Sequence, residues 1–530
     1  MKNLWLILFL LAAFPLHGQK YWICFTDKGG ALQPDLSLFD GNVSDRRTRL
    51  GIPWDDRDIA VCEEYVRQVA ALCDSAGYSS RWLNAMAVYT DEERLQQIMT
   101  LPFVEKTIPM EATAHILEAF PDKPEAVKLA RYQTERMGGK SFREKQITGK
   151  GVRIALIDAG FYGVQVYDGF KHIRDRGGII KTYDFIQKKE NVYHGSTHGT
   201  MVLSCIAGIH DTLRLGLAPD AEFLLARTEY LWGDTRNDED RWIAALEWAE
   251  QNGADLVNSS LGYTSARHFP YQLDGTSMIS RAANIAASKG VLVISSAGNE
   301  YNNSWRFITV PADADSVLTV GAINPATDYQ TSFSSIGPTA DGRIKPDVSA
   351  PGICAVINNP KLSISQGTSF SSPLVAGFAA CVLQWKRKNV DAVQLKDMIV
   401  RSGHLFPYFD YSHGYGIPQA DNILRPRMDE RKFRLDEQDG RMTVVPYTNA
   451  VKDSNDYKLL YYHVQGRSGN IRLYRVVELD NNRPVDLHLL KESTGTGQEW
   501  RDNIEDDYTF YRGEILRVFF EGHYEEYLFK

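Results

Sequence analysis

Cysteine is scarce in this sequence, with six residues in a chain of 530. So low a density excludes the disulfide framework of a small secreted domain and leaves room for one or two bridges at most, with Cys24 as a candidate partner. Cys62 and Cys73 fall in one expected helix, residues 58–76. Helical rise would separate them by about 16 Å, so they cannot bond to each other. The fold must rest on its hydrophobic core.

Long apolar runs are also missing after the first residues, because no later stretch reaches the roughly 18 residues of a membrane span. The start of the chain differs. Met1-Lys2-Asn3 is basic, and an apolar run over residues 4–14 follows. This pattern predicts a signal peptide, residues 1–19, with an uncleaved membrane anchor as the alternative. We therefore expect an exported protein, extracellular or periplasmic, with no membrane span in the mature chain.

An excess of positive charge is absent as well. The formal net charge is −8 and the isoelectric point is about 5.9. Both values argue against a nucleic-acid partner. The acidic run over residues 234–240 precedes an expected helix at 241–251, so it is more simply a stabilised helix N-terminus than a site for basic peptides.

Three short polar motifs follow or precede apolar stretches. Asp158 ends an apolar run at residues 152–157, which predicts a strand whose carboxyl end carries the carboxylate. His198 opens an apolar segment that predicts a helix, and Ser369 opens another, in which Pro373 suits the first turn. A serine hydroxyl needs a base to take its proton, and that base needs a carboxylate to orient it. These three residues therefore predict a catalytic triad.

The start of a helix offers free N–H groups and a positive dipole end, which favour an oxyanion at Ser369. Asn299 follows another apolar strand, residues 291–294, and its amide could supply a second donor. Cys205 and Cys381 fall within the two apolar helices, where they are expected to be small core residues.

Other chemistries fit the sequence poorly. His194 and His198 have the spacing of a zinc helix but lack the glutamate that would act as base. Ser371 stands where the nucleophile elbow of an α/β-hydrolase requires glycine. No phosphate-binding glycine loop stands out. We expect neither a metal nor a cofactor.

With these motifs in the order Asp, His, Ser, residues from about 149 to 424 resemble the subtilisin-like serine peptidases, or subtilase family. The resemblance implies catalytic Asp158, His198 and Ser369, and an oxyanion role for Asn299. It also implies a strand that pairs with the substrate backbone. The residues assigned to that strand are Ser260, Leu261 and Gly262.

Two departures from the family pattern stand out. Ala159 replaces the usual Ser or Thr after the catalytic aspartate, which removes one local hydrogen bond but no member of the triad. The stretch after the histidine helix, residues 209–214, lacks the oxygen ligands of the calcium loop found there in many relatives. No calcium is expected at that place.

The segments on either side of this domain have patterns of their own. Residues 20–112 alternate expected strands and helices, at 21–25, 58–76, 83–89, 91–99 and 104–108, as in a small α+β domain. In front of a subtilase domain it resembles the inhibitory propeptide, with an ordinary accessory domain as the alternative. Residues 113–147 are rich in charge and are expected to be an exposed linker where processing could occur. Short alternating runs predict a C-terminal β-sandwich at 430–530, whose role stays open.

The expected fold class is α/β, a subtilisin-like parallel sheet with flanking helices at 148–425, preceded by the propeptide-like domain and followed by the β-sandwich. The expected function is that of a secreted serine endopeptidase made as a precursor. Its partners would be protein or peptide substrates and its own propeptide. Two alternatives stay open, an exopeptidase and an inactive peptide-binding protein. Residues 262–275, longer and more aromatic than a minimal loop, leave the exopeptidase open.

Overall fold

The computed structural model describes residues 19–110, 113–114, 123–230, 239–264, 270–425, 430–438, 441–447, 458–479, 483–487 and 510–530. The chain forms two compact units, residues 1–35 with 54–111, and residues 36–53 with 112–530. The expected signal peptide lies outside the described residues except for Gln19. In the described ranges, no helix has the length and apolar character needed to cross a bilayer.

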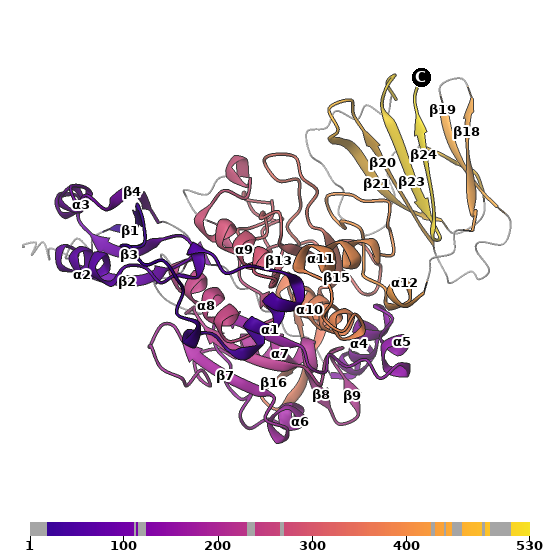
Figure 1. Ribbon diagram of the computed structural model, residues 1–530. Coiled ribbons are helices and arrows are strands. Elements are labelled where there is room, and N and C mark those ends of the chain that lie inside the picture. The colour runs from indigo at the N-terminus through magenta and orange to yellow at the C-terminus, as the bar shows by residue number, and fades with distance from the viewer. Residues whose placement is uncertain are drawn as a thin grey trace, which may run out of the picture. The chain divides into compact units, whose positions relative to one another are not determined.

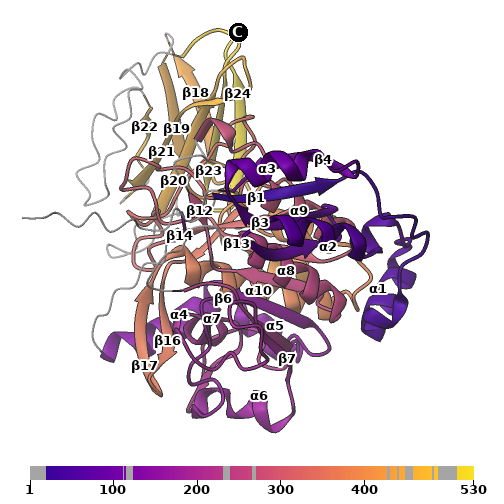
Figure 2. The ribbon, with the colours of Figure 1, turned by 90° about the vertical axis from the view of Figure 1, so that its left-hand side faces the viewer.

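The first unit is a four-stranded antiparallel sheet with two helices on one face (Figure 2). The strand order is β2-β3-β1-β4. One core joins the two helices to one face of the sheet, including Ile23, Val69, Val88 and Ile98. The chain order β-α-β-β-α-β is that of a ferredoxin-like fold, which confirms the expected small α+β domain. Its elements are β1 (Gln19–Phe25), α2 (Glu63–Leu72), β2 (Ser75–Ser80), β3 (Ala85–Thr90), α3 (Glu92–Met99) and β4 (Val104–Pro109).

The helix expected over residues 58–76 is shorter than predicted. It begins after Cys62 and ends before Cys73, and from Ser75 the chain pairs with β3 instead. Gly77 and the neighbouring serines have low helix propensity, so pairing with β3 determines their conformation. All six cysteines of the chain are free thiols, Cys24 among them.

The second unit is built on a seven-stranded parallel sheet with the order β15-β14-β13-β11-β6-β10-β7. Figure 1 labels β7, β13 and β15 of this sheet. Most of its strands are buried along their whole length because helices cover both faces. Parallel strands place all their carboxyl ends at one edge of the sheet. The strands are β6 (Arg153–Asp158), β7 (Ile179–Asp184), β10 (Glu222–Arg227), β11 (Leu256–Ser259), β13 (Leu292–Ser296), β14 (Leu318–Ile323) and β15 (Val348–Pro351).

Two pairs of long helices enclose this sheet. The helices α7 (His198–Ala207) and α10 (Thr368–Trp385) share one core with the sheet, in which Cys205 and Cys381 are buried as expected. The helices α8 (Glu239–Gln251) and α9 (Met278–Ser288) contact each other and also pack on the sheet. Further elements of this part are α6 (Lys171–Asp175), β8 (Ile209–His210), β9 (Leu213–Arg214), β16 (Ile353–Asn358), β17 (Lys361–Gln366), α11 (Ala392–Arg401) and α12 (Ala420–Leu424).

The exposed linker expected at residues 113–147 is contradicted from residue 123 onward. The helices α4 (Lys123–Glu135) and α5 (Gly139–Glu144) pack into the core of the second unit, where Ala130 and Phe142 are buried. Gln133 is also buried and donates to the carbonyls of Leu215 and Ala355 at 2.7 and 3.2 Å. The residues Ala126, Leu129 and Ala130 form an apolar stripe at helical spacing. The prediction missed this stripe because charged residues on the outer face of α4 dominate the composition of the segment.

One helix from the N-terminal hundred residues belongs to the second unit. This helix, α1 (Gly41–Leu50), is drawn in indigo in Figure 1. Asp40 caps its N-terminus and Gly51 ends it in the left-handed conformation. No helix was predicted within this segment of the expected domain at 20–112, because the segment has only two apolar side chains, Val43 and Leu50.

The C-terminal region forms two antiparallel sheets that share one core, as expected for a β-sandwich. Phe433 and Val444 come from the first sheet, and Tyr462 and Val518 from the second. The first sheet holds β18 (Phe433–Gln438), β19 (Arg441–Pro446) and β22 (Val485–Asp486). The second holds β20 (Lys458–Gln465), β21 (Ile471–Leu479), β23 (Ile515–Phe520) and β24 (His523–Leu528).

Candidate active site

Asp158 and His198 meet at the carboxyl edge of the sheet. Asp158 is the last residue of β6, and His198 is the first of α7. Both side chains are buried, and Nδ1 of His198 lies 2.8 Å from Oδ1 of Asp158. The same carboxylate oxygen accepts the N–H of Ala159 at 2.7 Å, whereas Oδ2 has no hydrogen-bond partner in the described part of the chain. The pair orients the imidazole so that Nε2 is the nitrogen left for chemistry.

The contact between Asp158 and His198 depends on a close approach of the two loops that carry them. Gly160 has a φ of 148°, and a Cβ at this position would lie 2.4 Å from the carbonyl oxygen of His194. Its own carbonyl accepts the N–H of Gly199 at 3.0 Å. Only glycine lets the aspartate loop lie this close to the histidine loop.

Ser369 is the second residue of α10, which follows Gly367 with a φ of 142°. Its hydroxyl donates to the carbonyl of Ser260 at 3.1 Å and is 3% exposed. The ring of the next residue, Phe370, lies 5.8 Å from the ring of His198, centroid to centroid. The structure thus brings the Ser369 loop next to the Asp158–His198 pair.

The sequence predicted Pro373 in the first turn of its helix. In the structure it lies in the second turn of α10, because the helix begins at Thr368. A proline has no N–H to donate to the carbonyl four residues earlier, which is that of Ser369. The hydroxyl of Ser260 donates to this carbonyl instead, at 2.8 Å. The proline therefore frees a backbone acceptor that ties the serine loop to the residue after β11.

Asn299 lies in the loop that follows β13. Its side-chain oxygen accepts the N–H of Thr368 at 2.9 Å and the hydroxyl of Thr368 at 3.0 Å. These two bonds fix the amide beside Ser369 and leave its NH₂ group as a donor. This is the arrangement that an oxyanion donor needs.

Ser260, Leu261 and Gly262 lie between β11 and the short strand β12 (Tyr263–Thr264). The backbone of β12 pairs antiparallel with β5 (Thr113–Ala114), with Tyr263 opposite Ala114. Gly262 approaches Thr309 so closely that a Cβ would lie 2.1 Å from its hydroxyl. The chain therefore places an extended segment of itself beside the predicted substrate-binding residues.

A buried acid near Asp158 was missing from the sequence-based prediction. Glu229 follows β10, and one of its oxygens accepts the hydroxyl of Tyr263, while Oε2 has no hydrogen-bond partner among the described residues. Burial raises the pKa of Glu229 to about 7, and the nearby charge of Asp158 adds to the rise. Burial and Glu229 also raise the pKa of Tyr263 well above its usual range. The only sequence signal was a carboxylate just after an apolar strand.

The remaining predictions concern metals and the acidic run. Residues 209–214 form the hairpin of β8 and β9, with Asp211 at its turn in the left-handed conformation. In the described ranges, no three His, Cys, Asp or Glu side chains gather as metal ligands. Residues 231–238 lie outside the described residues, and Glu239 and Asp240 begin α8. That helix starts two residues before the expected position.

Comparisons with known proteins agree with this geometry. A family model described as the subtilase family matches residues 149–416, which is half of the chain. A second model, described as the peptidase S8 propeptide domain of Bacteroidota, matches residues 20–125. From residue 20 onward, the first unit and the segment inserted in it thus lie within the propeptide match.

Individual relatives point the same way. The chain is 28% identical to Subtilisin NAT of Bacillus subtilis subsp. natto over 347 residues, covering 64% of this chain and 81% of the relative. It is 30% identical to Subtilisin BL of Lederbergia lenta over 265 residues, covering 49% of this chain and 87% of the relative. The solved structure of fervidolysin from Fervidobacterium pennivorans has the same fold, with a TM-score of 0.55 and 17% identity, and the match covers 95% of this chain and 71% of that one. The chain belongs to the subtilase family of serine peptidases and carries the propeptide domain of such enzymes.

Proposed function

We propose that the chain is an exported serine endopeptidase in which Asp158, His198 and Ser369 form the catalytic triad. The observation that carries the proposal is the buried 2.8 Å contact between Asp158 and His198, with Ser369 held beside it at the start of α10. In this role Ser369 attacks the peptide carbonyl. His198 takes the serine proton and later gives it to the leaving amine, and Asp158 holds the imidazole in the required tautomer.

Attack requires one side-chain movement. The hydroxyl of Ser369 donates to the carbonyl of Ser260 and must turn toward Nε2 of His198. The negative charge that develops on the substrate oxygen would be met by the amide NH₂ of Asn299 and by the N–H of Ser369 at the helix start. Because Asn299 is already fixed by Thr368, little reorganisation is needed when the charge forms.

Substrate would bind as an added strand next to Ser260, Leu261 and Gly262. The pairing of β5 with β12 supports this role, because it shows that the backbone after Gly262 accepts an extended antiparallel segment. We assign Thr113–Ala114 to the place of a substrate strand in the precursor. Processing would then fall within residues 115–122, since the next residues form the packed helix α4.

Export completes the proposal. The basic start and the apolar run at residues 4–14 remain a predicted signal peptide, and the mature chain would act in the extracellular or periplasmic space.

The proposal is tested by labelling with a fluorophosphonate probe, which reacts with activated serines. Wild-type protein should be labelled, whereas Ser369→Ala should not. Ser371→Ala is a matched control, since Ser371 is also buried in α10 and its hydroxyl donates to the carbonyl of Pro351 at 3.0 Å. Labelling of Ser369→Ala, or none of a processed wild type, would refute the triad and favour the inactive binding protein.

A peptide blocked at both ends separates the endopeptidase from the exopeptidase. An endopeptidase cuts such a peptide internally, whereas an exopeptidase needs a free terminus. We expect an internally quenched, doubly blocked peptide to be cut by the wild type and by Ser371→Ala. Cleavage only after one end is unblocked would replace the endopeptidase assignment.

A further inference from the structure

The helix α1 buries two arginines in addition to its one fully buried apolar side chain, Val43. Arg46 and Arg47 are each 2% exposed, and both contact the same oxygen of Glu250, at 3.1 and 3.2 Å. Arg46 also donates to the carbonyls of Lys289 and Ala254, at 3.1 and 2.7 Å. An arginine guanidinium with this many partners fixes the position of its helix closely.

The partners of α1 share one place in the fold. Glu250 lies near the C-terminal end of α8, and Lys289 follows the C-terminal end of α9. Helix C-termini carry partial negative charge, so they favour a cation such as Arg46. The N–H of Asp40 completes the contact by donating to the carbonyl of Gln251 at 2.8 Å.

The C-terminal ends of α8 and α9, where α1 binds, lie at the edge of the sheet opposite to the candidate active site. Because α8 leads into β11 and α9 leads into β13, the C-terminal ends of these helices lie at the amino ends of the strands. Asp40 likewise pairs with Arg153, the first residue of β6, at 3.4 Å. Asp158 ends the same strand, which spans about 17 Å at the usual rise per residue. Contacts of α1 therefore do not involve the catalytic edge.

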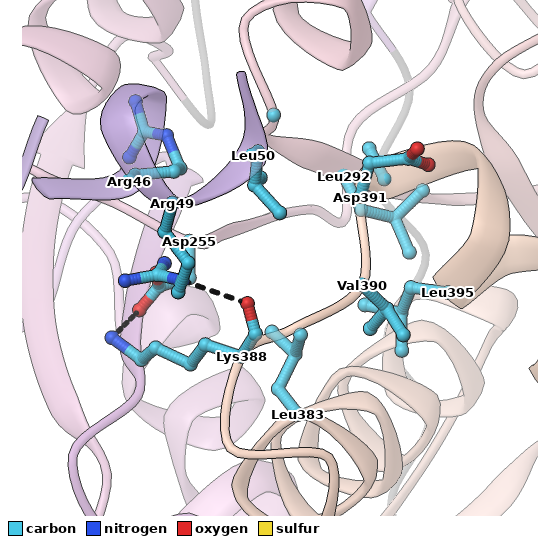
Figure 3. A pocket seen from close by; sticks show the side chains of 12 residues that line it. Arg46, Arg49, Leu50, Asp255, Leu292, Leu383, Lys388, Val390, Asp391 and Leu395 are labelled. Atoms are coloured by element: carbon cyan, nitrogen blue, oxygen red, sulfur yellow. Dashed lines mark hydrogen bonds and ion pairs between the residues drawn. The ribbon is translucent and has the colours of Figure 1, made fainter. Parts of the chain in front are cut away.

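The surface between α1 and its neighbours resembles a docking interface more than a continuous core (Figure 3). Arg49 donates to the carbonyl of Lys388 at 2.9 Å, and Lys388 pairs with Asp255 at 2.6 Å. A small hollow remains beside them, with Leu50 and Leu292 in its lining. Arginine is enriched at surfaces that associate, and contacts between domains are more polar than domain interiors.

We infer that residues 36–53 are an anchor by which the N-terminal region holds the peptidase domain at the edge opposite to the catalytic site. The anchor is separate from the pairing of β5 with β12, so a cut between residues 114 and 123 does not release it. The N-terminal region then stays bound as a non-covalent subunit after processing. This inference rests on the proposed function in one respect only, namely that the protein itself cuts the chain within residues 115–122.

An externally cut chain tests the anchor without relying on the protein's own activity. The full chain with Ser369→Ala receives the recognition sequence of a site-specific protease within residues 115–122. After the cut, size-exclusion chromatography measures how much N-terminal fragment elutes with the peptidase domain. We expect co-elution with the native anchor, and a dissociation constant about 100-fold higher for the double variant Arg46→Ala, Arg47→Ala, as for loss of a buried charge pair.

Ser44→Ala is the matched control, because Ser44 lies on the same helix but is exposed. It should co-elute like the native chain. Glu250→Gln removes the charge that the arginines meet without changing α1, and should weaken association in the same direction. This variant keeps the test decisive if the double variant, checked before cutting by its thermal unfolding, does not fold. Dissociation of the native cut chain, or equal co-elution of Glu250→Gln or a folded double variant, would overturn the anchor.

Discussion

Two buried glutamates of the second unit, Glu229 and Glu250, have opposite surroundings. Glu229 follows the carboxyl end of β10, near Asp158, and its charged form is disfavoured by burial. Glu250 lies near the end of α8, at the other edge of the sheet, and both Arg46 and Arg47 contact it. Both side chains are fully buried.

The difference shows how one sheet uses charge for two purposes. At the carboxyl edge, two carboxylate oxygens have no hydrogen-bond partner among the residues that the structure describes, Oδ2 of Asp158 and Oε2 of Glu229. A group with incomplete bonding can change its partners or its protonation during a reaction. At the amino edge, the charge of Glu250 is matched by two arginines, which suits a contact that holds two segments together. The two edges should therefore respond differently to the loss of a carboxylate.

The largest effect is expected for the catalytic edge. Asp158→Asn should lower kcat by about 10⁴-fold while the fold remains, because the amide favours the wrong tautomer of His198. Asp184→Asn is the matched control. Asp184 also ends a strand, is fully buried, and pairs with Arg227 at 2.8 Å. The control should lose stability and keep most of its kcat in peptide hydrolysis assays. Equal losses of kcat would remove the distinction between the two aspartates.

At the amino edge, the expected loss is in stability. Glu250→Gln leaves two buried guanidinium groups without their counter-charge and should lower the free energy of unfolding by about 3–5 kcal/mol. Glu222→Gln is the control, because Glu222 pairs with Arg153 at 2.9 Å but is 36% exposed. We expect about 1 kcal/mol or less there. Urea unfolding of both variants in the Ser369→Ala background measures the difference, and similar losses would contradict the special role of the buried pair.

Asn299 tests whether the catalytic edge stabilises charge as well as moving protons. Asn299→Ala should lower kcat by about 10²–10³-fold with little change in KM, a loss of the size seen for such a donor in subtilisin. Asn303→Ala changes the same residue type in the following turn and should leave kcat within about twofold, as surface substitutions usually do. A change in KM alone would assign Asn299 to substrate binding.

The positions of the candidate catalytic residues at the ends of strands and helices could be predicted from the sequence because these residues obey local rules. Asp158 ends an apolar strand, and His198 and Ser369 begin apolar helices, so each position is visible within about ten residues. The register of the sheet then brings together loops that are far apart in the chain. The wrong prediction of an exposed linker at α4 has a different cause. The sequence contains the apolar stripe of this helix, but the many charged residues around it favoured the prediction of a linker.

The anchor could not be predicted in this way. Two of the three buried residues of its helix are Arg46 and Arg47, and arginines in a helix usually indicate exposure to solvent. Their partner Glu250 lies more than 200 positions later in the sequence. Nothing near residue 46 shows that a carboxylate will meet it. Buried ion pairs between distant segments are visible only once the fold has placed the partners.

The smallest effect, and the sharpest contrast between the two glutamates, is expected from pH. The pKa of Glu229 is raised from 4.5 to about 7 in the folded chain, so folding favours its protonated form. The stability that depends on this proton is complete below pH 4.5 and is lost as the pH rises through about 7, up to about 3 kcal/mol. Glu229→Gln has no such proton to lose. Urea unfolding in the Ser369→Ala background should give similar stabilities at pH 4.5 and a more stable variant at pH 8. Parallel profiles for the two chains would show that folding does not raise the pKa of Glu229.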